Sequence, residues 1–131
     1  MIAASRVAIA AALVAFLVGS TLGLAMGVGW LGLQWRPAHA HVQSLGFVTL
    51  MIQGVAYHVL PRFRGVPFRR ARLALLQVVV TIIAVIGMAS GWGLLLGPAW
   101  FAVWGTVAWA ANATFVALAL EVVLRPRPRP S

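Results

Sequence analysis

The sequence contains no cysteine, no lysine and no aspartate, and Glu121 is its only acidic residue. The missing cysteines exclude disulfides, thiolate metal sites and cysteine catalysis. Only 8% of the residues are charged, against about a quarter in an average soluble domain, and 63% are hydrophobic. Such proportions exclude an ordinary soluble domain and predict an integral membrane protein.

Long runs without charge define the expected spans. Residues 7–35 and 73–120 carry no formal charge. A bilayer core of about 30 Å needs about 20 apolar helical residues to cross it. The second run has 48 residues and would be about 72 Å long as one helix. It must therefore turn once, and Gly97-Pro98 is the expected position of the turn. The first run exceeds the hydrophobic part of a secretory signal, so we expect a retained span. We therefore predict an all-α domain, residues 1–124, with four transmembrane helices over about 5–30, 38–60, 71–95 and 98–124.

The arginines are divided unequally between the two sides of such a bundle. Arg6, five arginines within 62–72 and three in the Arg/Pro tail 125–131 share one side, and Arg36 lies alone on the other. The positive-inside rule then predicts that both termini and the tail are cytoplasmic, in a multi-pass protein of a bacterial-type inner (cytoplasmic) membrane. We expect the arginine runs to contact the anionic lipid bilayer rather than nucleic acid.

Glycines recur every fourth residue on the first and third expected helices, at Gly19, Gly23 and Gly27 and at Gly87 and Gly91. Small residues let membrane helices approach closely. These stripes fit two alternatives, a contact between copies of the chain or packing within one copy.

All three histidines, His39, His41 and His58, fall on the second expected helix. A histidine inside a membrane is costly and indicates function. His39 and His41 are two residues apart, about 200° around a helix and about 3 Å along it, so they face opposite sides and cannot chelate one metal together. His58 lies about 25 Å beyond His41 and would belong either to a second site, alone or with Glu121, or to no site. Glu121 alternatively forms an ion pair with nearby arginines.

One imidazole projecting between helices is what an axial haem ligand requires. Apolar residues after His41 would form the wall of the haem pocket, and Gly46, which has no side chain, would let the haem ring approach the helix backbone. Arg36, the only arginine at that end, would bind the haem propionates or, alternatively, extend to the interface as a solvated cation.

The second expected helix also resembles a known sequence, the tenth helix of haem-copper oxidase subunit I. The resemblance rests on a His-x-His pair followed by glycines, a histidine and a proline at matching spacings: Ala38-His39-Ala40-His41, Gly46, Gly54, His58 and Pro61. It extends to short, four-helix, oxidase-subunit-I-like membrane proteins. The resemblance implies that His39 and His41 are axial iron ligands of two different haems. This chain lacks the other histidines that hold copper in that family, so we expect no enzyme activity from it alone.

These observations predict a haem b-binding membrane protein that transfers electrons to or from a redox partner, or binds nitric oxide or oxygen. One chain supplies few ligands, so we expect a homo-oligomer, with a dimer favoured and a trimer as the alternative. Two other functions stay open. The chain could bind copper through His39, His41 and a methionine, or it could be a structural or assembly subunit of a respiratory complex.

Overall fold

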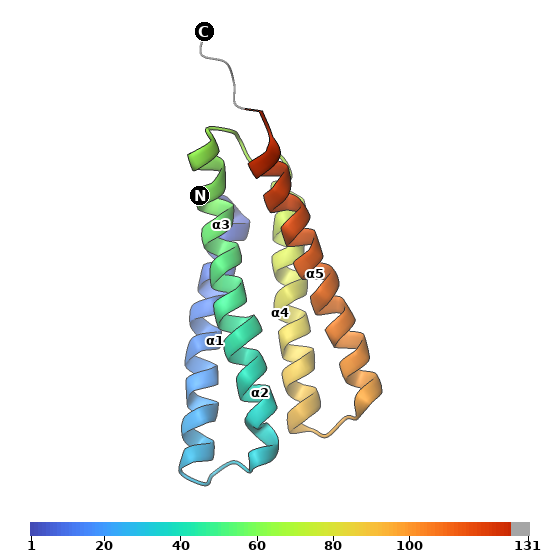
Figure 1. The fold of residues 1–131 in the computed structure, drawn as a ribbon. Coiled ribbons are helices and arrows are strands. Elements are labelled where there is room, and N and C mark those ends of the chain that lie inside the picture. Colours follow the sequence, from blue (N-terminus) through green and yellow to red (C-terminus); the bar gives the residue numbers. More distant parts are fainter. Residues whose placement is uncertain (127–131) are drawn as a thin grey trace.

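Four long helices lie side by side in the computed structural model, which describes residues 1–126 (Figure 1). They are α1 (Ala3–Gly27), a composite second span (Leu33–Arg64), α4 (Ala71–Gly93) and α5 (Pro98–Leu124). All four are long and apolar enough to cross a membrane, and residues 1–126 contain no strand. The all-α, four-helix prediction is therefore confirmed, and the apolar helices indicate a multi-pass membrane protein.

The bundle has two chemically different ends. The N-terminus, the loop 65–70 and the end of α5 lie together at one end, which we term the arginine-rich end (Figure 1). The loops 28–32 and 94–97 lie at the opposite end, which we term the Arg36 end. The predicted Arg/Pro tail falls, from residue 127 onward, outside the described residues.

The second span differs from the regular helix expected over 38–60. It begins with a 3-10 turn, η1 (Leu33–Trp35), continues as α2 (Arg36–His41), widens into a π-helix, η2 (Val42–Thr49), and ends as α3 (Leu50–Arg64). The wide turns are visible at Thr49, whose hydroxyl donates to the carbonyl of Ser44, five residues earlier, at 2.9 Å. π-helical turns are rare and occur frequently at functional sites. Nothing in the sequence predicted this one.

The second span also continues past Pro61, where we expected it to end. Its end is instead set by Gly65, whose positive φ of 63° is readily adopted by glycine. The Gly65 amide donates to the carbonyl of Arg62 at 3.1 Å, and the Val66 amide donates to that of Pro61 at 3.0 Å. This pair of bonds is a Schellman motif, which satisfies the last carbonyls of the helix.

Small residues hold the arginine-rich half of the bundle together. Ala4, Ala8 and Ala12 of α1 are fully buried against α3 and α4, and the core they form also includes Leu50, Tyr57, Ala74, Val78 and Leu118. α5 contacts α4 and α3, but within residues 1–126 it contacts neither α1, α2 nor η2. The second span and α5 therefore diverge toward the Arg36 end, as Figure 1 shows.

The glycine stripe of α1 packs within one copy of the chain. A Cβ added at Gly19 would lie 2.8 Å from Cδ of Gln43, and one at Gly23 would lie 3.0 Å from Cε1 of His39. Only Gly27 has open space, with no atom within 4 Å of such a Cβ. Of our two interpretations, packing within one copy is the one observed, because the chain's own second span covers Gly19 and Gly23.

The two glycines of α4 serve the same purpose against α5. A side chain at Gly87 would overlap the indole ring of Trp104, and one at Gly91 would overlap that of Trp100. The Trp100 Nε1–H group also donates to the Gly87 carbonyl at 2.6 Å. These glycines therefore admit two large aromatic rings between the helices.

Candidate functional site

His39 and His41 are both held by hydrogen bonds to backbone carbonyls. Nδ1 of His39 lies 2.7 Å from the carbonyl oxygen of Gly19, and Nδ1 of His41 lies 2.8 Å from that of Pro37. A carbonyl oxygen only accepts, so Nδ1 donates in both bonds and Nε2 keeps its lone pair. In the part of the chain that the structure describes, neither Nε2 makes a hydrogen bond. Metal-binding histidines are typically oriented in this way by the bond of their other nitrogen.

The two imidazoles point to different neighbours, as their spacing predicts. The His39 ring packs over Gly23 of α1, whereas the His41 ring lies beside Trp92 of α4, with ring centroids 6.3 Å apart. Trp92 in turn packs on Phe101 of α5, with centroids 4.1 Å apart. His41 therefore lies on an aromatic wall, on the part of the second span from which α5 diverges. One chain cannot direct both histidines at one metal ion.

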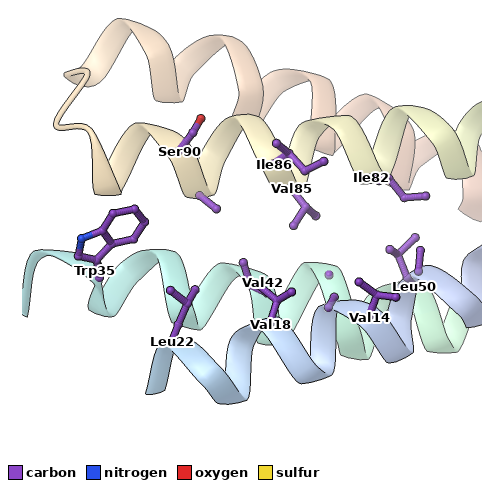
Figure 2. A pocket seen from close by; sticks show the side chains of 14 residues that line it. Val14, Val18, Leu22, Trp35, Val42, Leu50, Ile82, Val85, Ile86 and Ser90 are labelled. Carbon is purple, nitrogen blue, oxygen red and sulfur yellow. The ribbon is translucent and has the colours of Figure 1, made fainter. Parts of the chain in front are cut away.

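Gly46 lies in a separate place, an apolar groove between α1 and α4. The groove has a volume of about 590 Å³ and is backed by the second span (Figure 2). Its lining comes from α1 (Ala11, Val14, Ala15, Val18, Leu22), the second span (Trp35, Val42, Gly46, Leu50) and α4 (Ile82, Val85, Ile86, Ala89, Ser90). No histidine belongs to this lining. The structure therefore does not bring Gly46 and the imidazoles together, contrary to our expectation of a shared pocket.

Arg36 is the first residue of α2, and its side chain is exposed. It forms no hydrogen bond or ion pair with any residue of the described range 1–126. Five residues separate Arg36 from His41, which places them about 140° apart around the helix. Arg36 therefore lies nearer the His39 face than the His41 face.

At the arginine-rich end, the glutamate is engaged by arginines rather than by histidine. Glu121 forms an ion pair with Arg70, whose Nε lies 3.2 Å from a carboxylate oxygen, and accepts a hydrogen bond from Nη2 of Arg125 at 2.6 Å. His58 is half-buried on α3 and makes no hydrogen bond or ion pair within residues 1–126. The geometry agrees with the simpler expectation, an ion pair that anchors the end of α5.

A buried polar network connects three helices, and the sequence predicted only part of it. Gln77 accepts from the Tyr57 hydroxyl at 2.7 Å and donates to Gln53 at 3.1 Å and to Thr81 at 2.9 Å. Gln53 donates to Asn112 of α5 at 2.9 Å. Polar residues inside the spans predict hydrogen bonds between helices at Gln77, Thr81, Asn112 and Thr114. Gln77 and Asn112 form such bonds, whereas within the described residues Thr81 and Thr114 bond only inside α4 and α5. This expectation did not include Gln53 and Tyr57. Their spacing of four residues, one helical turn, was the available signal.

The described part of the chain offers isolated imidazoles rather than a metal cluster. Residues 1–126 contain no group of three His, Cys, Asp or Glu side chains placed to hold a metal ion. His39 and His41 also point to different neighbours, and an axial haem ligand needs only one imidazole. Comparisons with known protein families, with curated proteins and with solved structures give no match to this chain.

Proposed function

We propose that this chain is a haem b-binding membrane protein in which His41, and on the opposite face His39, is an axial ligand. The observation that carries the proposal is the bonding of both imidazoles. Each uses its Nδ1–H on a backbone carbonyl and leaves Nε2 as the ligating atom. His58, which lacks such a bond in the described range, is not included.

His41 is the better candidate of the two. The neighbouring ring of Trp92, which itself packs on Phe101, offers an apolar surface for a macrocycle, and α5 does not close over α2. His39 lies over Gly23 in a tighter contact. A bound haem would supply a one-electron couple or a site for nitric oxide or oxygen. The chain's own part is to fix the imidazole, exclude water and set the polarity around it.

The number of imidazoles that one chain can direct at one haem iron supports a symmetric oligomer. The two histidines at the Arg36 end face opposite sides, so an iron held by two imidazoles needs the second one from another copy; within one copy the second ligand would have to be Met26 or Met88. In a dimer, His41 of each protomer would ligate one shared haem. In a trimer, His41 of one protomer would face His39 of the next.

The location follows from charge. We place both termini and the arginine-rich end in the cytoplasm, because nine of the ten arginines lie there in a four-span arrangement. The haem would then lie near the outer face of a bacterial-type inner membrane. A redox partner or a dissolved gas would reach it from that side.

The test is the absorbance spectrum of the protein purified in mild detergent after expression with added haem. We expect a Soret band in the wild type and its loss in His41→Gly. Added imidazole should restore the band in His41→Gly, because a free ligand can fill the space of the missing side chain. His58→Gly is the matched control and should keep the wild-type spectrum.

His39→Ala separates the two faces and should leave the His41-dependent signal in place. A wild-type protein without a Soret band would refute haem binding. A band that survives both His41→Gly and His39→Ala would refute the ligand assignment.

A further inference from the structure

We propose that the groove between α1 and α4 is a binding site for one phospholipid from the leaflet at the Arg36 end, with an acyl chain in the groove and the phosphate at Arg36. This inference does not depend on haem binding, since no histidine lines the groove.

The dimensions of the groove fit a hydrocarbon chain from one leaflet. Along α1 it runs from Ala11 to Leu22, about 16 Å at the rise of an α-helix. That length is about half of the ~30 Å hydrocarbon core. The groove runs parallel to the helices, and therefore parallel to acyl chains in a bilayer that the helices cross.

The lining of the groove is almost entirely apolar from one end to the other. Trp35 and Ser90 lie at one end, and Leu50 and Ile82 lie toward the other, as Figure 2 shows. The Ser90 hydroxyl already donates to a backbone carbonyl at 2.9 Å, so even this end offers little to a polar group inside the groove. The occupant must therefore be apolar along the groove and polar only beyond Trp35.

Arg36 is the one cation available beyond Trp35. Arg36 directly follows Trp35 and is the only charged residue in 7–61. Among the described residues 1–126, it is also the only charged residue at the Arg36 end of the bundle. Its guanidinium is exposed and has no acceptor within the described residues 1–126. A phosphate in the headgroup layer is the complementary anion, and arginine binds phosphate with paired hydrogen bonds.

The rim of the groove argues against a helix from a second copy. Close approach of membrane helices requires small residues. The most exposed side chains along this groove include branched aliphatic ones: Val14 is 63% exposed, Val18 47% and Ile86 63%. Flexible hydrocarbon can follow such a surface, whereas a rigid helix cannot reach the floor at Gly46.

The experiment is native mass spectrometry of the full chain after extensive delipidation and addition of phosphatidylglycerol. Diacylglycerol with the same acyl chains is the probe without phosphate. We expect the wild type to retain one phosphatidylglycerol per chain and to prefer it over diacylglycerol by at least about tenfold. Ala89→Phe, which fills the groove, should reduce retention at least about tenfold, and Arg36→Gln should abolish the preference for the phosphate.

Ala110→Phe is the matched control, because Ala110 is exposed on α5, away from the groove. It should retain lipid as the wild type does. If Ala89→Phe does not fold, Val18→Trp at the rim replaces it. Retention unchanged by the groove-filling variant would overturn the site, and so would a dimer that this variant dissociates, since a second copy would then occupy the groove. Equal retention of diacylglycerol by the wild type would overturn the contact with Arg36.

Discussion

At the scale of single residues, the polar side chains of the spans differ in whether all of their donor and acceptor groups form hydrogen bonds within the protein. Gln53, Gln77 and Thr81 are almost fully buried and bonded to one another. His39 and His41 are partly buried and use one nitrogen each. The side chains of the first group are bonded to one another and are not accessible to a ligand, whereas each histidine keeps a lone pair on Nε2.

Gln77 is the centre of the buried network, and its removal should destabilise the bundle. Gln77→Leu would leave the Tyr57 hydroxyl and the Gln53 amide oxygen without their partner. We expect the free energy of unfolding to fall by about 1–3 kcal/mol. The measurement is unfolding by SDS titration, followed by circular dichroism. Gln34→Leu, at an exposed position, is the control, and equal stability of the two variants would contradict this account.

At the scale of elements, the composite second span separates two tasks. α2 is a regular helix, so His39 and His41 keep the opposite directions that their spacing predicts. η2 follows directly and contributes Val42 and Gly46 to the groove. A π-helical turn changes the rotation of everything beyond it. The groove face and the histidine faces are distinct, although they belong to one continuous span.

The glycine stripe of α1 allows a test of how that helix packs. Gly19→Leu would force the side chain into Gln43 and should strongly reduce the yield of folded protein, by the overpacking mechanism. Gly27→Leu enters open space and should fold normally. The measurement is the monodisperse fraction in size-exclusion chromatography. If Gly27→Leu instead dissociates an oligomer while Gly19→Leu folds, the stripe joins two copies.

At the scale of the whole molecule, charge and fold together predict an orientation in the membrane, and this prediction can be tested. The sequence has no cysteine, so single cysteines report without background. In intact cells, a membrane-impermeant maleimide should label Gln34→Cys but should label Pro67→Cys only after permeabilisation, because the positive-inside rule places the loop 65–70 in the cytoplasm. The reverse pattern would contradict the proposed topology.

The proposed haem site also predicts how copies of the chain assemble. We expect native mass spectrometry to show haem on a dimer, with a trimer as the alternative, and haem lost when the oligomer dissociates. The contact should involve the His41 face rather than the Gly19 and Gly23 face, which the chain's own second span covers. A stable monomer that carries one haem would refute the shared site.

The sequence by itself determined the spans and the directions of the histidines. Long runs without charge force helices in a bilayer, because lipid cannot satisfy backbone polar groups. The angle between His39 and His41 follows from helical rotation alone. Even so, local signals misjudged the end of the second span, because Pro61 fits within a helix that Gly65 ends.

Only the tertiary structure decided which residues each helix face contacts. Which carbonyls hold the imidazoles, which rings fill the glycine gaps and where α1 and α4 separate all depend on the packing of helices distant in sequence. The π-helix, too, has no signal of its own in the residues that form it. The reason is physical: helix formation is driven by local bonds, whereas the contacts of each face are set by the shapes of its neighbours.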